Sequence, residues 1–317
     1  MRISIQLTLS LVFASLLGAC TLLNGKKSES EPKLSKEEQK RLSEYKAEVT
    51  LGRDMAGRLL QYYGTYGEES LIGYVNQVGL YVASYSDHPD RRYMFSILDS
   101  ESVNAFACPG GYILVTLGSI RNAKSEAELA MILGHEVAHV GKQHMFNTLK
   151  SMGDREMEKA AKDNEKKGKL SKSFESEVRK RPTADTSESA ELLTRYLSQS
   201  AGAAMTLLQA AKAGMNVLLE QGLDKKLEYE ADYEGTTYAI RAGYEPKALL
   251  RFLTRLQKAK KKKKVSAKIL EKTHPKISDR KERIKKLLAK MDAKKITGAS
   301  GKSRYKSYIE ALPEKEN

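Results

Sequence analysis

His135-Glu136-Val137-Ala138-His139 is the stretch on which the interpretation of the whole sequence depends. It lies in an apolar run that begins after Ser125, and we expect this run to form a buried helix through about Leu149. Four residues separate the two histidines, so on a helix both imidazoles lie on one face, where they can share a metal ion. Glu136 projects from the neighbouring flank and can accept a proton from zinc-activated water. The pattern predicts a hydrolytic zinc site, against the alternative of two unrelated core histidines.

A catalytic zinc ion needs a third protein ligand, and the residues offer two candidates. His144 lies roughly 140° around a continuing helix from His139, at 100° per residue, so we assign it to packing or to a hydrogen bond. The other candidate is a carboxylate of Glu228-Tyr229-Glu230-Ala231-Asp232 on a second helix. Asp232 lies one turn after Glu228 and could orient a ligating histidine. A charged helix surface would explain the same residues, and the sequence pattern alone leaves the choice open.

The segments around the histidine helix predict an α+β fold that is mostly helical and contains a small β-sheet. Three short segments rich in β-branched or aromatic residues, two of them joined by the turn-forming Pro109-Gly110-Gly111, indicate strands. Helical spacing of apolar residues indicates several helices. The expected strands are 93–98, 103–107 and 112–116, and the expected helices include 36–63, a second one around 71–82, and three near 224–241, 246–259 and 276–291.

The predicted domain covers residues 36–292. Within it, residues 151–190 are dominated by charged residues and Ser, which predicts an insertion or flap rather than core. Small and apolar residues fill 201–219, which indicates a closely packed helix or a segment lying against a membrane. Residues 293–317 are expected to form a basic tail.

The N-terminus predicts export. Arg2 precedes an apolar stretch of about 15 residues, which is shorter than the roughly 20 needed to span a bilayer, so residues 1–19 indicate a secretory signal rather than a membrane helix. Leu17-Gly18-Ala19-Cys20 resembles a bacterial lipobox, which predicts cleavage before Cys20 and acylation of that cysteine. Residues 20–35 then form a polar tether. A single other cysteine, Cys108, excludes an intramolecular disulfide framework and is expected to be buried rather than redox-sensitive.

The chain has 55 Lys and Arg against 40 Asp and Glu, a net charge of +15. Such an excess usually favours nucleic acid or an anionic membrane as partner, and export removes nucleic acid from consideration. The basic surface could lie along lipid headgroups or could only maintain solubility. A membrane-binding module that uses the Lys-rich stretch 257–264 is a further alternative, and it predicts liposome binding that weakens with salt.

Several short motifs occur together in the order found in one family of zinc peptidases. They are Asn104-Ala105-Phe106-Ala107, Pro109-Gly110-Gly111-Tyr112, Ser125-Glu126-Ala127-Glu128-Leu129-Ala130 leading into the histidine helix, Glu228-Tyr229-Glu230-Ala231-Asp232, and Thr273-His274-Pro275 with Arg280. The chain resembles the gluzincin metallopeptidase family of HtpX, BepA and the CAAX prenyl proteases, and within it the exported bacterial lipoproteins. Unlike BepA, it is not expected to carry tetratricopeptide repeats, and unlike HtpX and the prenyl proteases it is not expected to contain paired long apolar spans.

The resemblance implies roles for individual residues. His135, His139 and Glu228, rather than Glu230, would bind one Zn²⁺, with Asp232 orienting a histidine. The strand of Asn104, Ala105 and Phe106 would pair with an extended substrate, against the alternative of an ordinary core strand. His274 would polarise the substrate or plug the open zinc position, unless it is a simple loop histidine before Pro275, and Arg280 would stabilise an oxyanion.

The function implied is a zinc-dependent endopeptidase of the bacterial cell envelope that cleaves misfolded or misassembled envelope proteins. It would be anchored through Cys20, and Thr21 after it indicates the outer membrane, facing the periplasm. The alternative is an envelope chaperone or assembly factor whose zinc is structural or capped by His274.

Overall fold

The computed structural model describes residues 34–152, 159, 207–261, 273–292 and 295–313. The expected signal, nearly all of the tether and most of the expected insertion lie outside the described residues. The chain forms two compact units, Met1–Leu42 and Ser43–Asn317. The first turns of helix α1 (Lys36–Tyr63) belong to the first unit, and the fold described below is that of the second. Ser35 and Glu38 cap the start of α1 by exchanging backbone-to-side-chain hydrogen bonds of 3.2 and 2.8 Å.

The three expected strands form one mixed sheet. β1 (Met94–Leu98) pairs in parallel with β3 (Tyr112–Thr116), and β2 (Ala105–Cys108) pairs antiparallel with the other side of β3. The turn between β2 and β3 needs its glycines, because Gly110 and Gly111 have φ angles of 72° and 100°. The order β1-β3-β2 leaves β2 at an edge of the sheet.

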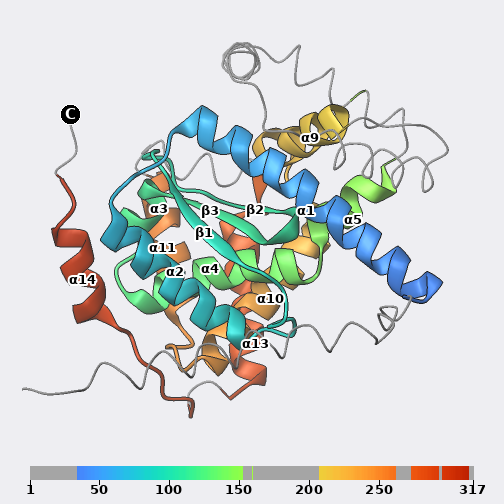
Figure 1. Ribbon diagram of the computed structural model, residues 1–317. Coiled ribbons are helices and arrows are strands. Elements are labelled where there is room, and N and C mark those ends of the chain that lie inside the picture. The colour runs from blue at the N-terminus through green and yellow to red at the C-terminus, as the bar shows by residue number, and fades with distance from the viewer. Residues whose placement is uncertain (1–33, 153–158, 160–206, 262–272, 293–294, 314–317) are drawn as a thin grey trace, which may run out of the picture. The chain divides into compact units, whose positions relative to one another are not determined.

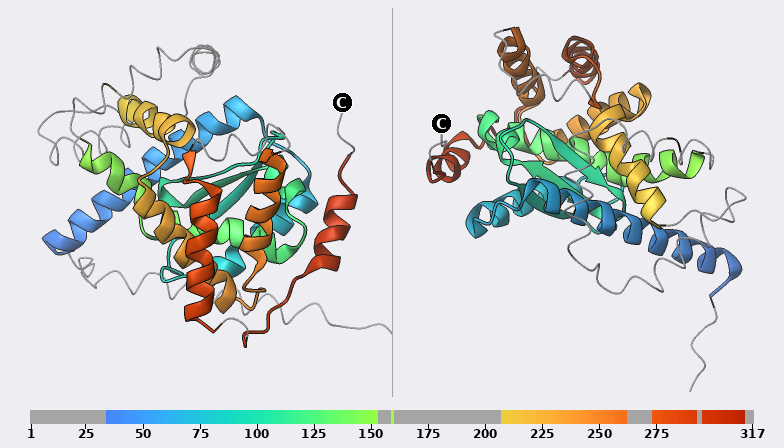
Figure 2. Two further views of the ribbon diagram at one scale, coloured as in Figure 1. Left: turned by 180° about the vertical axis from the view of Figure 1, so that it is seen from behind. Right: turned by 90° about the horizontal axis from the view of Figure 1, so that it is seen from above.

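Alternate residues of the strands point to two different hydrophobic clusters. Ala105 and Ala107 pack in the cluster that contains α2 (Glu69–Ser84) and α4 (Glu126–Gly141). Phe106 and Cys108 pack on the opposite face, in the cluster of α1 and α9 (Leu207–Asn216). In the right-hand view of Figure 2, α1 runs along one side of the strands. The expectation that Cys108 is buried is confirmed.

The histidine helix α4 begins where the sequence predicted, because the Ser125 side chain accepts a hydrogen bond from the Glu128 amide. Its end differs from the expectation. The predicted single helix through Leu149 is wrong, since α4 stops at Gly141 and a second helix, α5, spans His144–Ser151. The break lies at Gln143, whose φ of 56° is left-handed and cannot continue a right-handed helix.

The C-terminal half supplies helices that pack on α4 (Figure 1). The helices predicted near 224–241, 246–259 and 276–291 are confirmed within three residues as α10 (Lys225–Arg241), α11 (Ala248–Lys261) and α13 (Ile277–Lys290). Further elements are α3 (Leu117–Asn122) and a π-helical turn, η2 (Val217–Gln221), after α9. The predicted mostly helical α+β fold is confirmed.

Helix α14 (Lys302–Glu310) lies in the segment expected to be a basic tail. Tyr305 is buried, and its hydroxyl donates to the Ile120 carbonyl oxygen, while Arg304 pairs with the buried Glu126 of α4. Part of this segment therefore packs on the same core as the histidine helix. Among the described helices, none is long and apolar enough to span a bilayer.

Candidate metal centre

His135 and His139 face each other from successive turns of α4, as their spacing predicted. Their Nε2 atoms are 3.1 Å apart, and both side chains are buried. Helix α10 brings Glu228 against them, with its carboxylate oxygens 3.5 Å from His135 Nε2 and 3.6 Å from His139 Nε2. Two helices far apart in the sequence thus direct three metal-binding side chains into one buried space.

The donor set of this space fits a zinc ion. One ligand atom from each of the residues His135, His139 and Glu228 can be chosen so that all lie within 4.8 Å of one another. Glu228 Oε2 is buried without a hydrogen-bond partner in the described part of the chain, although a buried carboxylate oxygen normally has one. Two imidazole nitrogens and one carboxylate oxygen are the ligands of many catalytic zinc sites, which leave a further position open.

The charge of the surroundings also favours a cation. Burial alone would lower the pKa of His135, but the hydrogen bond to Asp232 and the nearby carboxylate of Glu228 together outweigh it and raise this pKa to about 9. Burial would likewise raise the pKa of Glu228, yet the neighbouring histidines bring it to about 2. Positive charge at His135 is therefore stabilised by the two carboxylates of α10. Burial instead lowers the pKa of His139.

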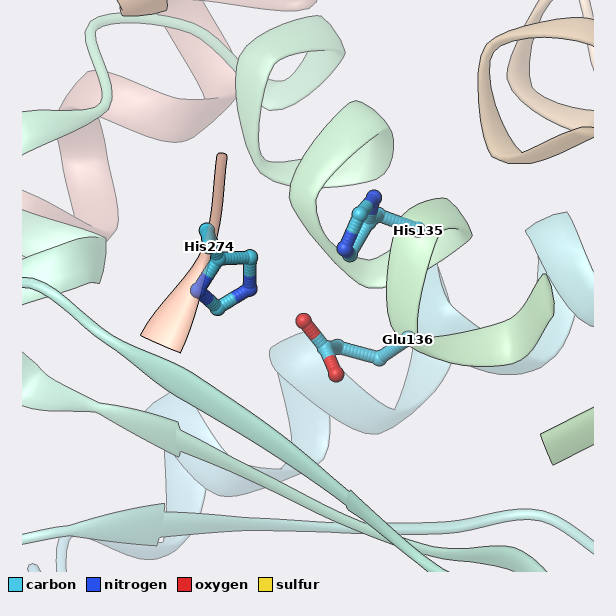
Figure 3. Close-up of side chains that lie close together, drawn as sticks. All are labelled: His135, Glu136 and His274. Carbon is cyan, nitrogen blue, oxygen red and sulfur yellow. The ribbon is translucent and has the colours of Figure 1, made fainter. Parts of the chain in front are cut away.

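Glu136 lies beside this group, on the flank of α4 that faces the sheet (Figure 3). Its carboxylate is buried, and one of its oxygens lies within 4.8 Å of ring nitrogens of His135 and His274. Burial raises the pKa of Glu136 to about 7. Figure 3 shows that His274 approaches from the segment before α13, on the other side of the space that Glu136 faces.

Behind His135, a carboxylate and a guanidinium form a buried pair. Asp232 Oδ1 lies 3.1 Å from His135 Nδ1, the ring nitrogen that points away from Glu228. Arg280 donates to both oxygens of Asp232, from Nε at 2.9 Å and from Nη2 at 2.7 Å. Burial would raise the pKa of Asp232, but the Arg280 charge and the histidine hold it below its usual range. Arg280 does not line the cavity at the site, so its expected oxyanion role stays a prediction.

A small cavity of about 30 Å³ adjoins the candidate ligands, room for roughly one water molecule. Its walls come from Glu136, His139 and Glu228, from the loop residues Thr273 and His274, from Met145, Gly222 and Leu223, from Val217 and Leu218 of η2, and from Ala105, Phe106 and Ala107 of β2. Asn104 does not line it, and its side-chain oxygen accepts a hydrogen bond from the Ala105 amide. Of the three residues expected to bind substrate, two therefore border the site.

Two residues near the site were not predicted to act there. His144 was expected to face away from His139 on a continuous helix, but the break at Gln143 turns it so that the two Nδ1 atoms are 2.9 Å apart. Glu48 of α1 is buried and accepts hydrogen bonds from Gly110 N, from Gln143 Nε2 and from Arg91. The sequence could have indicated that Glu48 is buried, because it lies three residues before the buried Leu51, on the same face of α1.

Paired histidines on one helix and a glutamate on a second, beside a small sheet, define a zincin-type metallopeptidase. Comparison with known families agrees, because residues 70–288 match the family model described as Peptidase family M48. The chain belongs to this family and is a metallopeptidase.

Curated relatives include the beta-barrel assembly-enhancing protease of Escherichia coli K12, 26% identical over 188 residues, which cover 59% of this chain and 32% of the relative. The putative beta-barrel assembly-enhancing protease of Vibrio cholerae is 26% identical over 183 residues, 58% of this chain and 32% of the relative. The mitochondrial metalloendopeptidase OMA1 of Arabidopsis thaliana is 41% identical over 49 residues, 16% of this chain and 10% of the relative. The matched region spans about a third of the length of the two bacterial relatives.

Proposed function

We propose that the protein is a zinc-dependent endopeptidase in which His135, His139 and Glu228 hold one Zn²⁺ and Glu136 is the general base. The observation that carries the proposal is the convergence of the three buried side chains, with an oxygen of Glu228 that no described donor satisfies. Zinc in such a site supplies a Lewis acid that polarises a carbonyl and acidifies water.

Glu136 is suited to move the proton that amide hydrolysis requires. Its carboxylate accepts a proton from the attacking water and then donates it to the leaving nitrogen. Because burial raises its pKa to about 7, both protonation states are accessible near neutral pH. The cation brought by zinc will lower this pKa, which favours the unprotonated base in the resting enzyme.

Asp232 and Arg280 are proposed to position His135. The carboxylate would accept the Nδ1–H of His135, which leaves the Nε2 lone pair for the zinc ion when it is bound. Arg280 fixes that carboxylate through two hydrogen bonds in a fork. Asp232 and Arg280 would thus fix the orientation of His135 from behind, as residues behind metal ligands commonly do.

His274 Nε2 lies 3.6 Å from Glu228 Oε2, a distance that supports either of the roles expected from the sequence. A side chain there can contact the substrate carbonyl or can fill the open position as a plug. His274→Phe separates the two roles, because loss of a substrate contact lowers kcat, whereas removal of a plug raises peptidase activity at equal zinc content.

Substrate binding along β2 is proposed because this strand is one of the two edge strands of the described sheet and, unlike β1, borders the cavity. An extended peptide could add to that edge by backbone hydrogen bonds.

The substrates are proposed to be misfolded or misassembled proteins of the bacterial envelope. The bacterial relatives carry the name beta-barrel assembly-enhancing protease, and the lipobox-like segment supports anchoring through Cys20 in the outer membrane, facing the periplasm. Metabolic labelling with a radioactive fatty acid tests the anchor, since label in the wild type must disappear in Cys20→Ser.

The test of the enzyme proposal is Glu136→Gln, which keeps the size of the side chain but removes the base. We expect this variant to retain zinc and to lose casein cleavage by at least about 100-fold. Complementation of a deletion strain by Glu136→Gln would instead favour an envelope chaperone or assembly factor with a structural zinc. Casein cleavage at the wild-type rate by the variant would contradict the proposed mechanism.

A further inference from the structure

The two candidate zinc histidines have different partners on their outer sides. His135 Nδ1 faces the carboxylate of Asp232, whereas His139 Nδ1 faces another imidazole, that of His144, at 2.9 Å. The rings of His139 and His144 meet edge to face, with centroids 5.0 Å apart and an interplanar angle of 78°. Both side chains are buried, so this contact is protected from water.

The direction of the hydrogen bond between these rings follows from the other face of His139. Its Nε2 points to His135 and Glu228, where a metal would need the lone pair of that atom. A neutral imidazole with a free lone pair on Nε2 carries its hydrogen on Nδ1. His139 Nδ1 is therefore the donor, and His144 Nδ1 is the acceptor.

We propose that His144 is a positioning residue of the metal centre, which accepts the Nδ1–H of His139 and thereby presents His139 Nε2 to the ion. The inference rests on the proposed function, since it concerns the same zinc site. His144 would orient His139 in the way that Asp232 orients His135, except that His144 is a neutral acceptor and Asp232 is a charged one.

The neutral acceptor has an electrostatic consequence. The two carboxylates of α10 at the site, Glu228 and Asp232, are already faced by Arg280 and the histidines. An imidazole at position 144 orients His139 without adding a third buried negative charge, which would be costly to desolvate. On its far side, His144 Nε2 lies 3.4 Å from Glu230 Oε2, outside hydrogen-bond geometry but close enough for attraction, and Lys142 approaches the same Glu230 at 4.0 Å.

The helix break is what makes this contact possible. A continuous helix would carry His144 roughly 140° away from His139, at 100° per residue. The left-handed backbone of Gln143 changes the direction of the chain between α4 and α5. The Gln143 side chain donates a hydrogen bond to Glu48 Oε2 at 2.5 Å. Glu48 also accepts from the Gly110 amide, so α1 ties the break to the turn between β2 and β3.

Two substitutions of His144 distinguish a role as hydrogen-bond acceptor from a role in packing alone. His144→Asn keeps a polar acceptor near the position of Nδ1 but loses the ring, whereas His144→Phe keeps the ring but loses the acceptor. His88→Phe is the matched control, because His88 is the one histidine of the five that lies outside the cluster of site histidines. Zinc affinity of the full chain is measured by competition with a chromophoric chelator, and unfolding of each metal-free protein is measured beside it.

We expect His144→Phe to weaken zinc binding about 10- to 100-fold, and His144→Asn and His88→Phe to stay within about threefold of the wild type. In ¹⁵N spectra of the zinc-loaded protein, the hydrogen-bonded Nδ1–H of His139 should persist in His144→Asn and be lost in His144→Phe. Equal affinities for the Phe and Asn variants, or tighter binding by Phe, would overturn the inference. If His144→Phe does not fold, wild-type affinity in His144→Asn supports the acceptor role and a large loss contradicts it. A wild type that binds no zinc would remove the proposed function itself.

Discussion

Gly134 of α4 and Gly235 of α10 meet backbone to backbone where the two helices cross. A Cβ atom on Gly235 would lie 2.4 Å from the His135 amide nitrogen, and one on Gly134 would lie 2.7 Å from the Gly235 carbonyl oxygen. Residues without side chains at this crossing allow the helix axes to approach closely. The close approach lets Glu228 and Asp232 reach His135 with their short side chains.

Gly235→Ala is therefore expected to push α10 away from α4. Overpacking of this kind costs about 1–3 kcal/mol of unfolding free energy, measured by urea denaturation of the metal-free protein, and zinc affinity should fall with it. Gly73→Ala on α2 is the control, because nothing lies within 4 Å of a Cβ there and alanine is the better helix former. Equal stability of the two variants would show that the crossing tolerates a methyl group.

Arg280→Met is expected to destabilise the protein by about 3–5 kcal/mol, because it leaves the buried Asp232 without its guanidinium partner. Arg283→Met, one turn later on α13, is the control. Arg283 is exposed and contacts the ring of Tyr229 at 3.8 Å, so its loss should cost no more than about 1 kcal/mol. Denaturant midpoints of the two variants measure the difference, and similar values would contradict a structural role for the Arg280–Asp232 pair.

The pKa of Asp232 predicts how acid affects stability. In the folded protein this pKa lies below its usual value of about 4, so the carboxylate stabilises the fold above pH 4 and this contribution is lost progressively as the pH falls below that. The stability difference between the wild type and Asp232→Asn should therefore be large at pH 6 and shrink at pH 3. Urea titrations of both metal-free proteins measure it, and a difference that does not change with pH would contradict the assignment.

Tyr305 is expected to hold α14 on the core. Tyr305→Phe removes the donor to the Ile120 carbonyl and should cost about 1–1.5 kcal/mol. Tyr308→Phe keeps the ring that stacks on Tyr74 with centroids 4.0 Å apart, and it should change stability by less than about 0.5 kcal/mol. Hydrogen exchange of the α14 amides measures the local effect, and similar exchange in both variants would argue against the anchoring role of the Tyr305 hydroxyl.

Local patterns in the sequence were enough for the elements that carry the site. Ser125 marked the start of α4, the glycines 110 and 111 marked the turn of the sheet, and the spacing of His135 and His139 predicted that they face each other. These features depend on residues close together in the chain, where spacing and backbone preference determine geometry.

Features that depend on packing between distant segments could not be predicted from residue spacing, and the expected role of Glu228 came from the family resemblance. Spacing alone could not choose Glu228 over Glu230, because the choice depends on how α10 crosses α4. The pairing of Arg280 with Asp232 and the packing of α14 likewise arise from tertiary contacts. The break at Gln143 was missed because Gly141 and Lys142 do not by themselves exclude a continuing helix, and the contact with Glu48 on α1 helps to hold it.

Zinc content of the purified chain, by elemental analysis of the wild type, Glu228→Ala and Glu230→Ala, tests most directly whether two helices share one ion. Glu228 lies beside both imidazoles, whereas Glu230 is exposed and lies near the outer side of His144 and near Lys142. We predict a single zinc ion per chain in the wild type and in Glu230→Ala, and little or none in Glu228→Ala after mild chelation. A wild type without zinc, or a Glu228→Ala variant that holds it as firmly as the wild type, would contradict the account.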